Sequence, residues 1–185
     1  MDTCSATDQN VASVIRNSTL SEGMVAVGHY EVACYDAGGA LKWSDTAPNL
    51  VPNQGKNGML DTYFAGSAYT AAWYMSLITA GTATANSTYA APTVIETTNA
   101  VITGRNAMNW IAAVGGSKSS AAVTFSIIGA ATITGNMVVM GGSGVATVGN
   151  TSATGGVLFS AANFAGGSKT VSNGDTLNVT YSIAV

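Results

Sequence analysis

The sequence contains very little charge. Only 8% of its 185 residues are Asp, Glu, Lys or Arg, against about 25% in an ordinary soluble domain. The deficit is greatest from Ala121 to Val185, where Lys169 and Asp175 are the only charged side chains. Because a soluble monomer of this size needs a charged surface, the composition predicts that a partner covers much of the exterior. A neutral exterior of Ser, Thr and Asn side chains is the alternative.

Basic residues are also too few to form a surface that binds nucleic acid. The chain has six Lys and Arg residues against nine Asp and Glu residues, and its net charge is −3. Contact with phosphates needs clustered Lys and Arg, so we expect no direct contact with nucleic acid. The chain also lacks a run of roughly 18 apolar residues, the length that a membrane helix needs. We therefore expect no membrane insertion.

Cysteine and histidine are scarce. Cys4, Cys34 and His29 are the only residues of these two types, and their spacing matches no zinc motif. We expect no metal and no cofactor. The first residues show no basic stretch followed by an apolar core, which predicts synthesis in a cytoplasm. In such a reducing compartment the two cysteines are expected to remain unbridged.

The residues that catalysis requires follow no recognisable pattern. His29 lies within a strand pattern with no nucleophile motif beside it. The acids available to a glycosidase share no motif; they are Glu31, Asp36, Asp61, Glu96 and Asp175. The Gly-rich stretches 115–118 and 141–144 lack the spacing of a phosphate-binding loop. We therefore expect no enzymatic activity.

What the sequence does contain is alternation of apolar and small or polar residues. The clearest examples are residues 122–128 and 176–185. A period of two predicts a strand with one face in a core and one in water. Further strand candidates lie at 24–35, 40–43, 94–97, 107–112, 131–140, 156–160 and 169–172, and residues 73–78 are a continuous aromatic and aliphatic strand candidate. Gly-rich and Asn-Gly turn signals separate them.

About eight or nine short strands from these ten stretches predict an all-β fold over residues 24–185, a β-sandwich for which a jelly roll is the leading topology. One short helix is expected near 55–64, although Gly55 and Gly58 weaken it. Residues 79–95 are expected to form a long loop. The residues expected to be buried in the core are Val27, Trp73, Met75, Leu77, Val123, Phe125, Ile127, Leu158, Leu177, Val179 and Tyr181.

Residues 1–23 are expected to form an N-terminal arm. Val11, Val14 and Ile15 are spaced for one side of a short helix that Asp8 would cap. The alternative is an extended segment that becomes ordered only on a partner. In both cases these three residues are the expected contact with a partner.

Several motifs resemble a group of small structural proteins of tailed bacteriophages. The resemblance covers roughly residues 28–183, and its motifs are the stretches 28–36, 41–43, 49–51, 72–78, 124–127, 131–135, 156–161 and 171–181. It implies a virion component made in the bacterial host cytoplasm. Within that group, the resemblance favours a cement or decoration protein on the outer capsid. Such a protein is a homotrimer or homodimer that bridges copies of the major capsid protein and has no catalytic residues.

Two other functions fit the same motifs. A head-fibre or tail-fibre protein would bind a host glycan on exposed aromatic residues, for which Trp43, Tyr69, Trp73 and Tyr89 are the candidates. A glycan-degrading enzyme is the other possibility, and it would need two of the acidic residues in one cleft.

Overall fold

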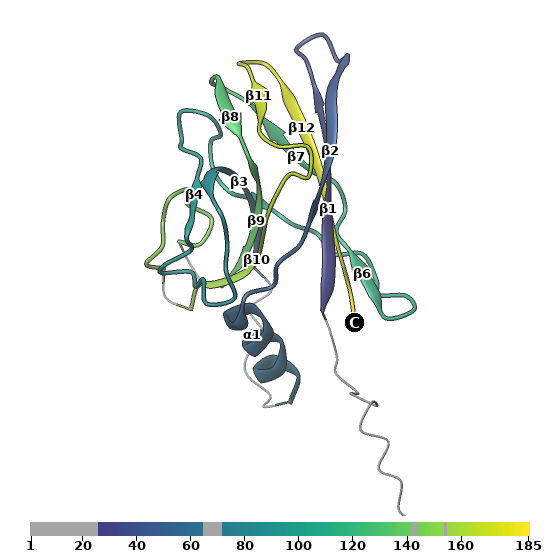
Figure 1. The fold of residues 1–185 in the computed structure, drawn as a ribbon, viewed down its shortest axis with the longest axis vertical. Coiled ribbons are helices and arrows are strands. Elements are labelled where there is room, and N and C mark those ends of the chain that lie inside the picture. The colour runs from purple at the N-terminus through teal and green to yellow at the C-terminus, as the bar shows by residue number, and fades with distance from the viewer. Residues whose placement is uncertain (1–25, 65–71, 142–143, 154) are drawn as a thin grey trace, which may run out of the picture.

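A computed structural model of the chain describes residues 26–64, 72–141, 144–153 and 155–185. The predicted arm contacts at Val11, Val14 and Ile15, and the predicted thiol at Cys4, lie outside these ranges. The described residues form one helix and twelve strands, and the strands pair in antiparallel fashion, so the all-β prediction is confirmed. The N- and C-terminal strands of the described part lie side by side (Figure 1).

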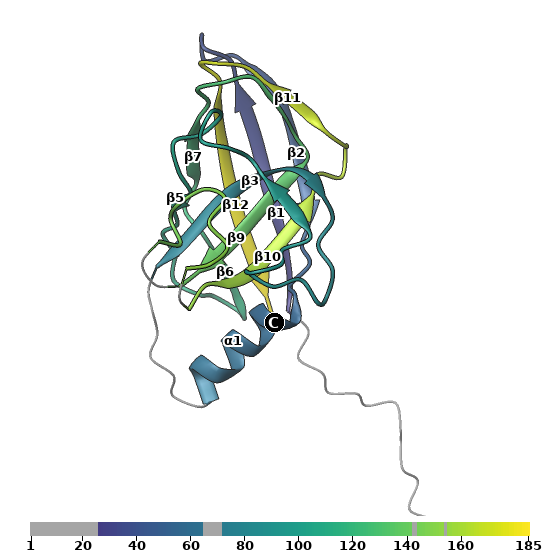
Figure 2. The same ribbon diagram turned by 90° about the vertical axis from the view of Figure 1, so that its left-hand side faces the viewer.

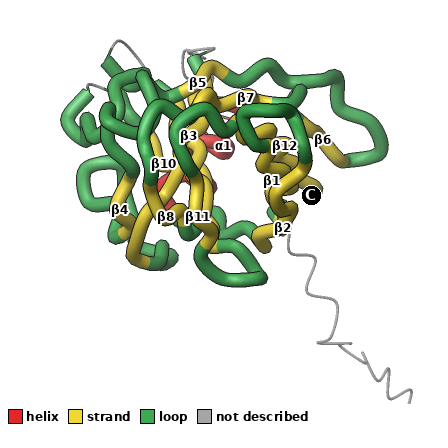
Figure 3. The backbone as a smooth tube through the Cα atoms, turned by 90° about the horizontal axis from the view of Figure 1, so that it is seen from above, coloured by secondary structure: helices red, strands yellow, loops and turns green. Residues whose placement is uncertain are grey.

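The first sheet has the order β2-β1-β12-β6, with β7 also paired to β12. The second has the order β10-β9-β3-β4, with β5 also paired to β3, and β8 pairs with β11 in a small third sheet. The two larger sheets lie on opposite sides of the molecule (Figure 3). Their strands are β1 Val27–Tyr35, β2 Leu41–Pro48, β3 Trp73–Gly81, β4 Val94–Glu96, β5 Asn106–Ala107, β6 Ser117–Ser119, β7 Val123–Ser126, β8 Ala131–Ile133, β9 Gly135–Met140, β10 Val157–Asn163, β11 Lys169–Val171 and β12 Thr176–Ala184.

One hydrophobic core lies between the two larger sheets. Alternate residues of β12 and β7, including Leu177 and Phe125, face alternate residues of β3 and β9, including Met75 and Val138. This alternation is the one that the sequence predicts. Of the predicted core residues, nine are buried: Met75, Leu77, Val123, Phe125, Ile127, Leu158, Leu177, Val179 and Tyr181.

The predicted burial of Val27 is wrong, because the side chain is 59% exposed. In β1 the inward residues are the even-numbered ones, Tyr30, Val32 and Cys34. Val27 lies on the other face of the strand with His29 and Glu31. Trp73, the first residue of β3, is half-buried and packs against the core. The prediction that it lies inside the core is therefore wrong.

The second sheet is covered on both faces, which explains its continuous apolar strands. The face away from the first sheet carries a second apolar cluster that includes Ile78, Val139 and Leu158. Loop residues Tyr89 and Val145 cover this cluster. In β10 a bulge between Leu158 and Ser160 changes which residues face inward.

Several predicted boundaries are wrong. The strand expected at 131–140 is divided at Thr134, because β8 pairs with β11 while β9 joins the second sheet. The loop expected at 79–95 is shorter, since β3 continues to Gly81 and β4 begins at Val94. The strand expected at 107–112 is reduced to β5 and an isolated bridge at Trp110. The predictions also miss β6.

The predicted hairpin at 36–39 is confirmed. The Oδ1 atom of Asp36 accepts hydrogen bonds from the backbone N–H groups of Gly38 and Ala40, both at 2.9 Å. Gly39 has a φ of 84°, a conformation that glycine adopts without steric cost. The turn that joins β1 to β2 therefore depends on an Asp side chain and a Gly, which are both visible in the sequence.

The helix α1, Asn53–Phe64, lies at the end of the molecule where β1 begins and β12 ends (Figures 1 and 2). A Cβ atom at Gly55 would lie 2.5 Å from the carbonyl oxygen of Phe159 in β10. The glycine that weakens the helix as an isolated segment therefore allows close packing on the sheet. Gln54 attaches the helix further, because its Oε1 accepts hydrogen bonds from the N–H groups of Tyr89 and Leu158, at 2.7 and 2.9 Å.

Candidate functional site

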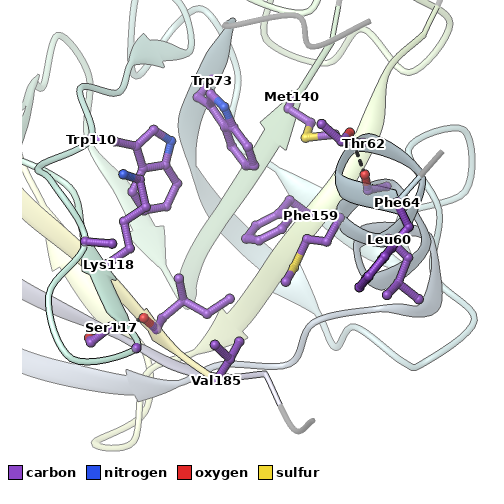
Figure 4. A pocket seen from close by; sticks show the side chains of 15 residues that line it. Leu60, Thr62, Phe64, Trp73, Trp110, Ser117, Lys118, Met140, Phe159 and Val185 are labelled. Atoms are coloured by element: carbon purple, nitrogen blue, oxygen red, sulfur yellow. Dashed lines mark hydrogen bonds between the residues drawn. The ribbon is translucent and has the colours of Figure 1, made fainter. Parts of the chain in front are cut away.

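An apolar pocket of about 770 Å³ opens at the end of the molecule that carries α1 (Figure 4). Helix α1 supplies one wall through Met59 and Leu60. The opposite wall comes from the β6 region and the end of β12, through Lys118, Ile183 and Val185. The pocket therefore lies where the edges of the two large sheets separate and the helix spans the gap.

Aromatic rings separate the pocket from the core. The Trp73 ring stands edge-on to the rings of Trp110 and Phe159, with centroid distances of 5.2 and 4.8 Å. Phe159 and Trp110 in turn contact the buried ring of Tyr181, at 6.3 and 5.9 Å. These edge-to-face contacts are a preferred arrangement for aromatic pairs. They give the pocket a rigid, non-polar floor.

The polar side chains around the pocket already have partners within the protein. The Thr62 hydroxyl donates to the Gly58 carbonyl at 2.7 Å, and the Ser117 hydroxyl donates to the Ile183 carbonyl at 3.3 Å. Lys118 donates to the Ile111 carbonyl at 3.0 Å, and its ammonium group lies 6.0 Å from the Trp110 ring centroid. Among the described residues that line the pocket, no side chain is a carboxylate, a histidine or a cysteine. The site therefore offers apolar contact area and one cation.

The surface around the pocket is also apolar. Leu60, Ile111, Val114 and Val185 are 43%, 54%, 80% and 60% exposed. Leu60 and Val185 line the pocket, whereas Ile111 and Val114 lie in the segment that supplies Trp110, Ala113 and Gly116 to it. Clustered apolar side chains of this kind are typical of binding surfaces. Sequence analysis missed the pocket because its lining comes from segments far apart in the chain that show no common motif.

A second hollow, of about 270 Å³, is built around a buried ion pair. The Nε atom of Arg105 donates to Glu96 at 2.7 Å, and their side chains are 1% and 8% exposed. Arg105 also donates to the Tyr89 hydroxyl and to the carbonyls of Val145 and Asn150, at 3.0, 2.7 and 3.0 Å. Burial alone would lower the pKa of Arg105, but these hydrogen bonds and the Glu96 charge raise it. Arg105 and Glu96 neutralise each other, which indicates that the ion pair is structural and connects the loops that contain Tyr89, Val145 and Asn150.

Of the acidic residues named as possible glycosidase groups, Asp36 and Asp175 lie in one region, since both charges influence the pKa of Cys34 and of Lys42. Glu96 pairs with Arg105, Asp36 accepts hydrogen bonds within its own turn, and Asp175 pairs with Lys42 at 2.5 Å. His29 lies 3.5 Å from Glu31 on the exposed face of β1. Within the described ranges, no group of three or more His, Cys, Asp or Glu residues is placed to hold a metal ion.

The Asp175 carboxylate lies beside the Cys34 thiol. Burial alone would raise the pKa of Asp175, but hydrogen bonds from Lys42 and the Ser172 N–H outweigh it and lower the value. Burial and the Asp175 charge raise the pKa of Cys34 to about 11. Since the thiolate is the reactive form, Cys34 is a structural residue in the folded protein.

The aromatic residues proposed as a sugar platform do not share a surface. Tyr89 is only 4% exposed beneath Arg105, whose guanidinium carbon lies 5.4 Å from the ring centroid. Trp43 packs on Phe164 with a centroid distance of 5.8 Å, whereas Trp73 lines the pocket. Tyr69 lies outside the described residues.

Together the sheets and the pocket define an all-β protein with one apolar end. The chain matches no protein-family model, and no curated protein is similar to it at a significant level. The resemblance to phage virion proteins therefore rests on the sequence motifs alone. In the ranges that the structure describes, no helix has both the length and the apolar character needed to cross a bilayer.

Proposed function

We propose that this protein is a non-catalytic virion component, a cement or decoration protein on the outer capsid of a tailed bacteriophage. It would bind the major capsid protein and itself assemble as a trimer or dimer. Its β-sandwich would belong to the jelly-roll-like class. The observation that supports the proposal best is the apolar end of the molecule, where an apolar pocket is lined in part by exposed Leu60 and Val185 and the lining segment 110–118 also exposes Ile111 and Val114.

Low charge and an apolar end are consistent with a protein that works on a shell. A subunit held in a lattice gains affinity from many modest contacts, because its neighbours are already positioned for binding. Such contacts do not need a catalytic group, and Asp175, Glu96 and Asp45 are each paired with a Lys or Arg side chain. The glycan-binding alternative has less support, because Tyr89 is buried and Trp43 and Trp73 are half-buried against the core, where they contact different aromatic rings.

Quantitative mass spectrometry and cryo-electron microscopy of the phage that encodes this chain test the proposal. We expect hundreds of copies in a regular array on the capsid, since a cement protein follows the lattice. A handful of copies confined to the tail would contradict the assignment. His29→Ala should leave assembly and infectivity unchanged.

Capsids that lack the protein allow the docking surface to be tested by adding back purified variants. Val114→Asp places a charge beside the pocket, whereas Ile128→Asp places one on a loop after β7; the two native side chains are 80% and 45% exposed. We expect the first variant to reduce capsid occupancy strongly and the second to have no effect. Equal occupancy for both would show that the apolar end does not contact the capsid.

A further inference from the structure

The pocket has a candidate occupant within the same chain. The pairing of Val27 with Ala184 places the start of β1 beside the end of β12. Ile183 and Val185, the neighbours of Ala184, line the pocket. The start of β1 therefore lies at the end of the molecule that carries the pocket; Figure 2 shows α1 and the C-terminal end of β12 together there.

The sequence of residues 1–25 contains an apolar group at helical spacing, besides Leu20, Met24 and Val25 nearer to β1. Val11, Val14 and Ile15 lie three and one residues apart, so a single helical turn presents them on one side. Eleven residues, 16–26, connect Ile15 to Val27. Such a connection spans up to about 36 Å when extended. The linker is therefore long enough for Ile15 to lie in a pocket next to Val27.

Charge also favours this segment. The Lys118 ammonium group on the pocket wall has no carboxylate within 4.0 Å among the described residues, since the four ion pairs found there involve other groups. Residues 1–25 carry Asp2, Asp8 and Glu22 against Arg16. Asp8 precedes Val11 by three residues, so in a helix its carboxylate would lie on the same side as the apolar group and could face Lys118.

We propose that, in the free protein, Val11, Val14 and Ile15 fill the apolar pocket of their own subunit, with Asp8 facing Lys118. The tether favours this occupant. A segment on a short linker has an effective concentration in the millimolar range, above that of any second copy in dilute solution. The inference concerns the protein without its capsid, so its failure and the failure of the proposed function are distinguishable.

Disulfide trapping in the full-length chain tests the contact. In a Cys4→Ser background, Val14→Cys is combined with Leu60→Cys at the pocket, or with Leu41→Cys as the matched control. Leu41 is 58% exposed and begins β2 after the hairpin turn. We expect an intramolecular disulfide for the Leu60 pair and none for the Leu41 pair. Equal trapping of both pairs, or trapping only as disulfide-linked dimers, would overturn the proposal.

Tryptophan emission provides a second, non-covalent readout. Trp73 and Trp110 line the pocket, so a Trp43→Phe background reports mainly on that site. In this background we expect the triple change Val11→Ser, Val14→Ser and Ile15→Ser to shift the emission to longer wavelength. It should also increase the affinity for an apolar dye about tenfold, because a tethered competitor is lost. The control triple Gln9→Ser, Asn10→Ser and Asn17→Ser should change neither measurement.

Two further outcomes would overturn the proposal. One is an unchanged emission spectrum in the apolar triple variant. The other is a small apolar molecule retained by the purified full-length protein, found by native mass spectrometry, which would identify a different occupant of the pocket.

Discussion

Tyr30, Asn49, Ser160 and Tyr181 show how polar residues are accommodated between the two sheets. The hydroxyls of Tyr30 and Ser160 share a hydrogen bond of 2.6 Å, Ser160 donates to the Asn49 side-chain carbonyl, and the Asn49 amide donates to the Tyr181 hydroxyl at 2.6 Å. Burial raises the pKa of both tyrosines. Their hydroxyls therefore remain neutral and act as structural hydrogen-bonding groups.

Trp73 gives a residue-scale prediction about the pocket floor. Trp73→Ala removes edge-to-face contacts with Trp110 and Phe159. Because Trp73 is half-buried, we expect a loss of about 3 kcal/mol in the free energy of unfolding, the lower end of the range for large aromatic residues. Denaturant titration measures it. Val27→Ala, at an exposed side chain, should change the value by less than about 0.5 kcal/mol.

Asp175 gives a prediction about pH. Its pKa is lowered in the folded state, so its stabilising effect is present above the unfolded pKa of about 4 and is lost as the pH falls through the folded value. Asp175→Asn should therefore be less stable than the native protein at neutral pH. The difference should disappear at strongly acidic pH. Urea titrations over this range, with Lys42→Met as a second way to remove the pair, measure the effect.

A further residue-scale prediction concerns Cys34, whose pKa of about 11 keeps the thiol protonated. In native protein near neutral pH, thiol reagents should react with Cys34 only as fast as the protein unfolds. After unfolding without reductant, two thiols per chain should react. A count of zero would contradict the expectation that Cys4 and Cys34 are unbridged.

At the scale of elements, Arg105 connects loops that the strand pairing leaves unconnected. It joins Glu96, the last residue of β4, to Tyr89, Val145 and Asn150. Arg105→Met leaves Glu96 buried without its partner, so we expect a loss of about 3–5 kcal/mol. Hydrogen exchange should increase in 82–93 and 144–153. Arg105→Lys should restore little, because an ammonium group cannot make the forked contacts.

At the scale of the whole molecule, the apolar end predicts self-association. Identical subunits that cover such a surface form closed symmetric assemblies. We expect sedimentation equilibrium to show a trimer or dimer, and Val114→Asp to shift the distribution toward monomer more than Ile128→Asp does. Deletion of residues 2–22 should leave a folded core but weaken capsid binding. Unchanged capsid occupancy after the deletion would show that the arm is passive.

The sequence by itself determined the all-β class, the hairpin at 36–39 and most core residues. These features depend on alternation and turn chemistry, which act over a few residues. Phe125, Leu177 and Val179 were predictable for that reason. The helix near 55–64 was predictable from its apolar stripe, although the reason for its glycines was not.

Only the tertiary structure decided which strands pair and where the pocket lies. The pairing of Val27 with Ala184 joins the two ends of the described chain, and no local pattern specifies a contact over that separation. The exposure of Val27 follows from which face of β1 meets the core, a choice that alternation leaves open. The pocket likewise forms because packing brings together distant segments, which are α1, Trp73, Trp110 and Val185. The hydrophobic effect is non-directional, so an apolar residue in the sequence does not indicate which other residues it will contact.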